Sequence, residues 1–136
     1  MNEEIKLEYL HLCDYACPAF NGKINLLGVF ESFFMQKELS KMADFYVALN
    51  IKVKARIDYK ISFEIQSGKD NEKIYVDKEP IMIKKDTLPV LSFNILKPIK
   101  EIVFKDFGDY KFIVLVNDLP IGYKEIRVEK LEIKSK

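Results

Sequence analysis

Hydrophobic and polar residues alternate over much of the chain, and the alternation is clearest in residues 45–53, 59–65 and 110–116. A period of two is typical of β-strands, because successive side chains point to opposite faces of a sheet. In the first two segments the intervening residues are largely polar, which predicts strands with one face in water. The third segment is apolar on both sides and therefore predicts a central strand.

Turn residues separate these segments. Asn21 and Gly22 form the strongest hairpin signal in the chain, because both central residues of a type I′ turn need positive φ angles. They predict a hairpin between a strand over about residues 5–14 and a strand over about residues 23–33. Further turn signals lie at 67–71 and 117–120.

Turns that recur at this spacing predict an all-β fold. The expected architecture is an antiparallel two-layer β-sandwich, immunoglobulin-like, with about seven or eight strands. A closed barrel is the alternative. Residues 34–43 have apolar residues near helical spacing and are the one candidate for a short helix, with a single turn or an irregular crossover as an equal alternative. Residues 1–130 are expected to form one domain, and residues 131–136 a polar tail.

The composition is that of a folded domain that needs no additional crosslinks. Of the 136 residues, 49% are hydrophobic, which supplies a core without disulfides or a structural metal. The 22 basic and 21 acidic residues nearly cancel, so no long-range field attracts phosphate backbones or anionic lipids. We therefore expect neither nucleic acid nor a membrane as a partner. With no apolar run of membrane-spanning length and no signal peptide, the expected location is cytoplasmic.

One short segment resembles immunoglobulin-like domains. Residues 106–112 read Asp-Phe-Gly-Asp-Tyr-Lys-Phe, which is similar to the Asp-x-Gly-x-Tyr-x-Cys stretch of that family. The resemblance implies a structural tyrosine corner formed by Asp106, Gly108 and Tyr110, in which the hydroxyl bonds to the backbone upstream. Phe112 occupies the position of the family's disulfide cysteine, and the chain has no tryptophan. The resemblance therefore supports the architecture and implies no function.

A wider resemblance begins near the N-terminus. Residues 13–16 (Cys-Asp-Tyr-Ala), 21–25 (Asn-Gly-Lys-Ile-Asn) and 28–31 (Gly-Val-Phe-Glu) resemble the opening of an uncharacterised family of small bacterial β proteins, a domain of unknown function. Members of that family also end in a Gly-x-Tyr strand, which residues 108–110 match. This resemblance implies no activity.

His11, Cys13 and Cys17 are the nearest approach to a metal-binding cluster. A structural zinc site needs four ligands, whereas this chain has one histidine and two cysteines. The favoured interpretation is that the two cysteines are ordinary thiols on a hairpin that bind no metal. A metal shared with a second subunit across an interface is the alternative. The single histidine is not accompanied by a nucleophile motif such as Gly-x-Ser-x-Gly, for which it could act as the general base. We therefore expect no catalytic residues, no cofactor and no enzymatic activity.

Carboxylates near turns suggest a second kind of site. Asp106, Asp109 and Asp118 flank the strand at 110–116, and loop carboxylates of β-sandwiches can bind calcium. The first two precede the strand and the third follows it, which argues against a single site. Small-ligand or calcium binding by these loops is the alternative function.

The aromatic segment at 28–35 is the candidate for partner contact. Phe30, Phe33, Phe34 and Met35 are more aromatic than one strand face can bury, and the favoured interpretation is that they wrap around an end of the sandwich into the core. The functional alternative is an exposed apolar surface that contacts a protein partner or a second copy. The expected function is a non-catalytic protein–protein interaction module, with homodimerisation as its simplest form. An enzyme whose residues are scattered in sequence is the third hypothesis.

Overall fold

The computed structural model describes residues 5–35, 40–41, 44–85 and 92–130. Regular structure is almost entirely β-strand, with a short 3₁₀ turn, η1 (Phe20–Gly22). No helix of the described residues has the length and hydrophobicity needed to span a membrane. The strands are β1 (Ile5–Pro18), β2 (Ile24–Phe30), β3 (Ser32–Met35), β4 (Ser40–Lys41), β5 (Phe45–Val53), β6 (Tyr59–Ser67), β7 (Lys73–Val76), β8 (Ile81–Ile83), β9 (Ser92–Ile99), β10 (Val103–Phe104), β11 (Gly108–Val116) and β12 (Leu119–Lys130).

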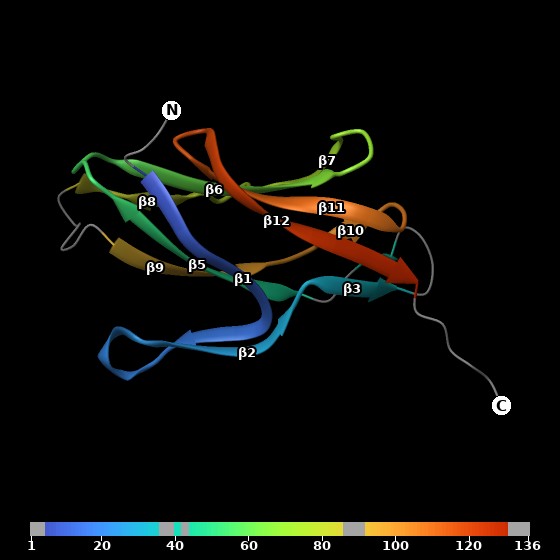
Figure 1. The fold of residues 1–136 in the computed structure, drawn as a ribbon, viewed down its shortest axis with the longest axis horizontal. Coiled ribbons are helices and arrows are strands. Elements are labelled where there is room, and N and C mark those ends of the chain that lie inside the picture. The colour runs from blue at the N-terminus through green and yellow to red at the C-terminus, as the bar shows by residue number, and fades with distance from the viewer. Residues whose placement is uncertain (1–4, 36–39, 42–43, 86–91, 131–136) are drawn as a thin grey trace.

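The strands form two main sheets that face each other across the core (Figure 1). One sheet has four strands in the order β2-β1-β5-β9, all antiparallel. The other has the order β3-β12-β11-β6-β7, with β8 also paired to β6, and its β3–β12 pair is parallel. β4 and β10 form a separate pair. The prediction of an all-β, two-layer sandwich is confirmed.

The sequence predicts about seven or eight strands. The structure has more, because it includes several strands of only two to four residues, which are too short to show an alternating pattern. The segment predicted as one strand over 23–33 is divided at Glu31, with β2 in one sheet and β3 in the other. The described part of segment 34–43, the one candidate for a short helix, is strand, in β3 and β4. The rest of that segment and the predicted tail at 131–136 lie outside the described residues.

The core lies between the inner faces of the two main sheets. β5 contributes Val47, Leu49 and Ile51, which face Phe63 of β6 and Phe112 of β11, and all five side chains are fully buried. β11 lies between β12 and β6, in the central position that its apolar pattern predicts. Removing one such side chain from water contributes roughly 1.5–3 kcal/mol, so this burial is the main source of stability.

Two tyrosine hydroxyls anchor the starts of neighbouring strands. The hydroxyl of Tyr110 in β11 lies 2.8 Å from both the backbone carbonyl oxygen and Oδ1 of Asp106. The hydroxyl of Tyr59 in β6 donates to the carbonyl oxygen of Ala55 at 2.6 Å. Both rings are buried, and both bonds reach the residue four positions upstream. The first is the contact of a tyrosine corner, and Gly108 completes its turn with a φ of 131°.

A largely buried ion pair joins the two sheets at the edge where β9 approaches β7. Lys97 lies on the inner face of β9, opposite Val47, and its Nζ is 2.7 Å from both carboxylate oxygens of Asp77. The two side chains are 14% and 2% exposed. Asp77 is itself fixed to β6, because its N–H donates to the carbonyl oxygen of Phe63. The pair therefore links β9 of one sheet to β6 of the other at the edge of the sandwich.

Replacing Lys97 with methionine is expected to lower the free energy of unfolding by about 3 kcal/mol, because the carboxylate of Asp77 is left buried without its cation. The matched control is Lys60→Met, which removes an ion pair with the exposed Asp118 and should change stability by less than ~1 kcal/mol. Urea unfolding measures both values. Equal losses in the two variants would show that the Lys97–Asp77 pair behaves as a surface pair.

Burial and the hydrogen bond to Asp106 raise the pKa of Tyr110 from 10.0 to about 12. The folded protein therefore holds the phenolic proton more tightly than the unfolded chain does. This stabilisation is complete below pH 10 and is lost as the pH rises toward 12. Tyr110→Phe is expected to lower the free energy of unfolding by about 1–2 kcal/mol at neutral pH and to flatten its alkaline decline in urea unfolding. An unchanged alkaline decline would contradict the assignment.

Candidate functional site

The outer half of the β1–β2 hairpin bends away from the rest of its sheet and runs back below β5 and β9 in the view of Figure 1. β5 begins at Phe45, so the pairing of β1 with β5 ends where Cys13 meets Tyr46. Beyond that point β1 pairs with β2 alone. We call residues 15–30 the arm.

Three residues with positive φ angles shape the arm. Asn21 and Gly22, the predicted hairpin turn, have φ angles of 61° and 73°. Gly28 has a φ of 68° and lies against Asp14, where a Cβ atom would come within 2.3 Å of the aspartate Oδ2. A side chain at this position would be strained and would displace Asp14. The glycine therefore fixes how β2 runs beside β1.

Large apolar side chains are exposed along the arm. Tyr15, Leu27 and Val29 are 47%, 62% and 52% exposed, and Phe20 at the turn is 85% exposed. Tyr15 is directly opposite Leu27, and Val29 follows two residues later, so these three share one face of the hairpin. The ring of Tyr15 packs edge-on against Tyr46, with 5.2 Å between the centroids, which ties this face to the sheet. We call Tyr15, Phe20, Leu27 and Val29 the arm surface.

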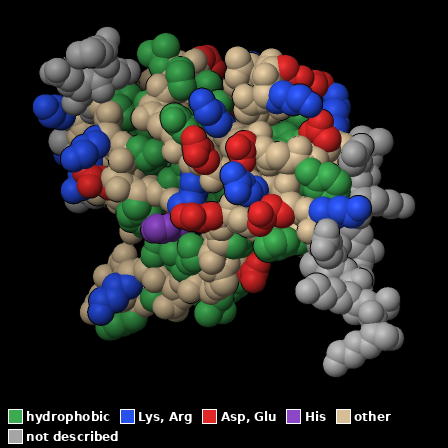
Figure 2. All heavy atoms as spheres, turned by 45° about the vertical axis from the view of Figure 1, so that its right-hand side comes forward, with side chains coloured by type: hydrophobic (Ala, Val, Ile, Leu, Met, Phe, Trp, Pro, Cys, Tyr) green, Lys and Arg blue, Asp and Glu red, His purple; other side chains and the backbone are tan. Residues whose placement is uncertain are grey.

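The arm carries almost no charge. Residues 15–30 contain one charged residue, Lys23, in a chain of which 32% is charged. Figure 2 shows that acidic and basic side chains gather over the upper body, whereas the lower part, where the arm lies, is largely apolar or neutral. This neutral run can be read from the sequence and is the signal that identifies the arm.

The other face of the arm folds back over the outer face of the four-stranded sheet. A cleft of about 610 Å³ separates them, and its lining includes Ala16, Pro18, Ile24, Tyr46 and Leu96. The side-chain amide of Asn94 in β9 donates to the carbonyl oxygen of Gly22 at 3.5 Å. This long, exposed bond connects the turn of the arm to β9 of the sheet.

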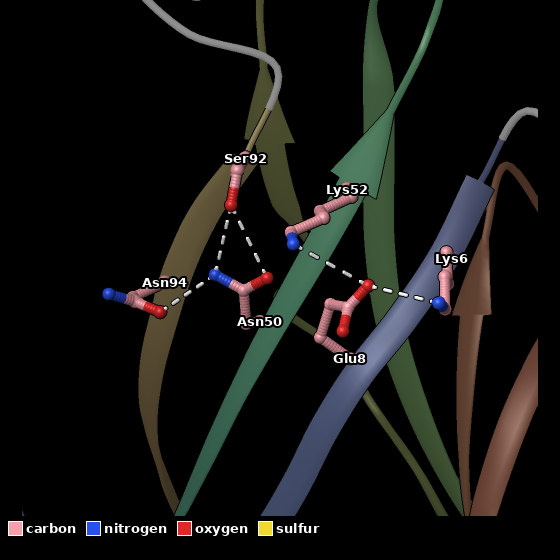
Figure 3. A network of polar contacts seen from close by, with 6 residues as sticks. All are labelled: Lys6, Glu8, Asn50, Lys52, Ser92 and Asn94. Atoms are coloured by element: carbon pink, nitrogen blue, oxygen red, sulfur yellow. Dashed lines mark hydrogen bonds and ion pairs between the residues drawn. The ribbon is translucent and has the colours of Figure 1, made fainter.

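Polar side chains cover the sheet beside the cleft (Figure 3). The amide nitrogen of Asn50 donates to Oδ1 of Asn94 at 2.9 Å. Glu8 lies between Lys6 and Lys52, whose Nζ atoms are 3.4 and 3.7 Å from its Oε1. Because these residues come from β1, β5 and β9, the contacts join neighbouring strands of this sheet.

A second cavity, of about 660 Å³, lies beside the Lys97–Asp77 pair. Tyr75 lines this cavity, and burial together with the carboxylates of Asp77 and Glu79 raises the pKa of Tyr75 to about 12. The Nζ of Lys97 also donates to the carbonyl oxygen of Glu79. With three acceptors around one ammonium group, the hydrogen-bonding capacity of Lys97 is used in joining the sheets.

The structure does not assemble His11, Cys13 and Cys17 into a metal site. The described part of the chain contains no group of three His, Cys, Asp or Glu side chains placed to hold a metal ion. His11 stacks on Tyr9 at 5.5 Å, and within that part its buried Nδ1 has no hydrogen-bond partner. Burial raises the pKa of the Cys13 thiol, which donates to the carbonyl oxygen of Tyr46 at 3.7 Å. A buried, protonated thiol is a poor ligand and a poor nucleophile.

The three carboxylates considered for calcium lie at two ends of β11. Each has its own partner: Asp106 the hydroxyl of Tyr110, Asp109 the Nε of Arg127 at 3.2 Å, and Asp118 the Nζ of Lys60 at 2.6 Å. The arrangement therefore does not bring the three side chains into one site.

The four residues predicted as a contact surface do not form one exposed surface. Phe33 and Met35 are buried in the core, and the ring of Phe30 packs 4.8 Å from that of Phe33. Phe34 is the exception, at 53% exposed. The reason is that the chain enters the second sheet after Glu31, and alternate residues of β3 then point into the core. The correction is that the exposed apolar residues lie mainly on the arm.

The adjacent phenylalanines of β3 allow a direct comparison. Phe33→Ser is expected to lower the free energy of unfolding by about 3–5 kcal/mol, because it removes a buried ring. Phe34→Ser should change it by less than ~1 kcal/mol, as surface substitutions do. Urea unfolding of both variants measures the difference, and similar losses would mean that both rings pack in the core.

The fold is similar to that of several solved structures, two of which are much longer proteins. The Pseudomonas fluorescens alkylpurine DNA glycosylase AlkC, bound to DNA containing an abasic site analog, matches with a TM-score of 0.55 and 11% identity over 92% of this chain and 30% of that one. A β-glucosidase from Listeria innocua in complex with glucose matches with a TM-score of 0.50 and 10% identity over 93% and 16%. An immunoglobulin-like protein from Pseudomonas aeruginosa matches with a TM-score of 0.45 and 11% identity over 93% and 98%. The chain thus spans less than a third of the first two proteins, and at these identities the likeness concerns the fold alone.

Sequence comparison identifies the family. No curated protein matches the chain. The sequence pattern of DUF6941, described as a family of unknown function, matches residues 8–129, which include the three motifs at 13–16, 21–25 and 28–31. The predicted resemblance to an uncharacterised family is confirmed. Since the match covers most of the sequence, the chain belongs to DUF6941, a family of unknown function.

Proposed function

We propose that this protein is a non-catalytic protein–protein interaction module and that the arm surface is its contact site. The observation that carries the proposal is the exposure of Tyr15, Phe20, Leu27 and Val29 on a segment with one charged residue. Tyr15, Leu27 and Val29 share one face of the hairpin, and exposed apolar patches of this kind are typical of contact sites. Aromatic residues at such sites supply much of the binding energy.

The arm is also held in place before any partner binds. Its turn is tethered to β9 by Asn94, the Tyr15 ring rests on Tyr46, and Gly28 fixes the course of β2. A surface that is already ordered loses little conformational entropy on binding, which favours affinity. These contacts support a role for the arm as a rigid contact element.

The alternative function, calcium or small-ligand binding by loop carboxylates, has less support. The acids at 106, 109 and 118 are divided between two ends of β11, and each already has a protein partner. A nucleic-acid partner has little support as well, because phosphate backbones are bound by Lys and Arg and the arm contains only Lys23.

A matched pair of valine variants tests the proposal. Val29 on the arm and Val76 on β7 are both 52% exposed. Val29→Lys places a charge in the arm surface and is expected to abolish partner binding, whereas Val76→Lys should leave it intact. The measurement is the set of proteins retained from an extract of the source cells by tagged wild type and by each variant.

The expected result is a specific protein, or the untagged chain itself, retained by wild type and Val76→Lys but not by Val29→Lys. Thermal unfolding of both variants checks that each is folded. If the same proteins are retained by all three forms, the arm surface is not the contact site and the proposal fails.

A further inference from the structure

β2 is a free edge of the four-stranded sheet, since its one neighbour among the described strands is β1. The N–H of Ala19 donates to the carbonyl oxygen of Lys23 at 2.7 Å, which makes this pair the first hydrogen-bonded pair of the hairpin. Such pairs alternate along an antiparallel ladder, so the peptide groups of Asn25 and Leu27 face β1. Those of Ile24 and Leu26 face away and are free to bond to another strand.

The other edge strands are protected against pairing. β9 contains Pro98 and the inward-pointing Lys97, and β7 begins with Lys73. β8 and β3 have only three and four residues. Prolines, charges and short length are the usual means by which edge strands avoid each other. β2 has seven residues, none charged and none proline, so it lacks this protection.

The charges at the ends of β2 indicate what pairs with it. The neutral strand lies between Lys23 and Glu31, both of them exposed. Glu31 is 3.5 Å from the Nζ of Lys124, but its side chain remains 76% exposed and can also meet a second cation. If two copies of β2 pair antiparallel about a twofold axis at Leu27, Lys23 of each copy lies opposite Glu31 of the other. A parallel pair would instead place like charges together. The two ends of the strand are thus complementary to a second copy running in the opposite direction.

We propose that the partner of the arm is a second copy of this chain, joined through antiparallel pairing of β2 with β2. In this register Leu27 meets Leu27 of the second copy, Asn25 meets Val29, and Ile24 meets Phe30. The pairing bonds the free peptide groups of Ile24 and Leu26 and unites the two arm surfaces. It is an isologous contact, closed after two subunits. The inference rests on the proposed function, because it names the partner of the same surface.

Residue-resolved amide hydrogen exchange tests the pairing on the unmodified protein. Sedimentation should show a dimer, and the Ile24 and Leu26 amides should exchange about tenfold or more slowly than in the monomeric Val29→Lys variant. The Asn25 and Leu27 amides, which face β1, are expected to be protected in both forms. A dimer in which the Ile24 and Leu26 amides exchange freely would overturn strand pairing but leave the arm surface as the contact site.

Charge reversal tests the register. Lys23→Glu and Glu31→Lys are each expected to raise the dimer dissociation constant about tenfold, because two attractions become two repulsions. The double variant should restore it to within roughly threefold of wild type, and the control Lys54→Glu, away from β2, should leave it unchanged. A double variant as weak as the single ones overturns the register.

A chain that stays monomeric at millimolar concentration overturns the second copy as partner. The comparison of Val29→Lys with Val76→Lys in an extract then still decides the proposed function, since it does not depend on self-association. The two failures are therefore distinguishable.

Discussion

The backbone of β1 must satisfy its hydrogen bonds along fourteen residues, and no single neighbouring strand is long enough to do so. β5 pairs with β1 from Ile5 to Cys13, and β2 pairs with the rest of β1 as far as Pro18. This division creates the arm, because the outer half of β1 can remain a strand only if the chain turns back on it at Asn21 and Gly22. The cleft, the exposed apolar surface and the open edge of β2 all follow from this one requirement.

The two edge strands of the four-stranded sheet, β9 and β2, differ in how their free edges are protected. At β9 a lysine that points inward is neutralised by Asp77, which ties this edge to the second sheet. At β2 there is no charged or proline residue, and no backbone pairing joins this strand to the second sheet among the described strands. The β9 edge is thus protected by an ion pair and its hydrogen bonds, whereas the β2 edge has free peptide groups beside apolar side chains.

Much of the fold could be predicted from the sequence because local rules govern it. Period-two alternation predicts β5, β6 and β11. Asn21 and Gly22 predict the hairpin turn because asparagine and glycine tolerate the positive φ angles that they adopt there. The division of 23–33 between two sheets could not be predicted, since Phe33 and Phe34 have the same chemistry and only the sheet crossing decides which one is buried. Lys97 likewise looks like a solvated residue in the sequence, and only the fold brings Asp77, directly after β7, beside it. The candidate surface was misplaced for the same reason, although the neutral run at 15–30 marks the arm in the sequence itself.

The arm surface is built from side chains that lie close together in the chain and contribute little to the core. Its residues are therefore released from most of the packing constraints that govern β5, β6 and β11. Tyr15 and Val29 nevertheless lie in the motifs at 13–16 and 28–31 that the chain shares with its family, so core packing does not explain why these residues belong to the family pattern. The fold thus separates side chains that hold the sandwich together from exposed side chains whose value to the protein lies outside the core.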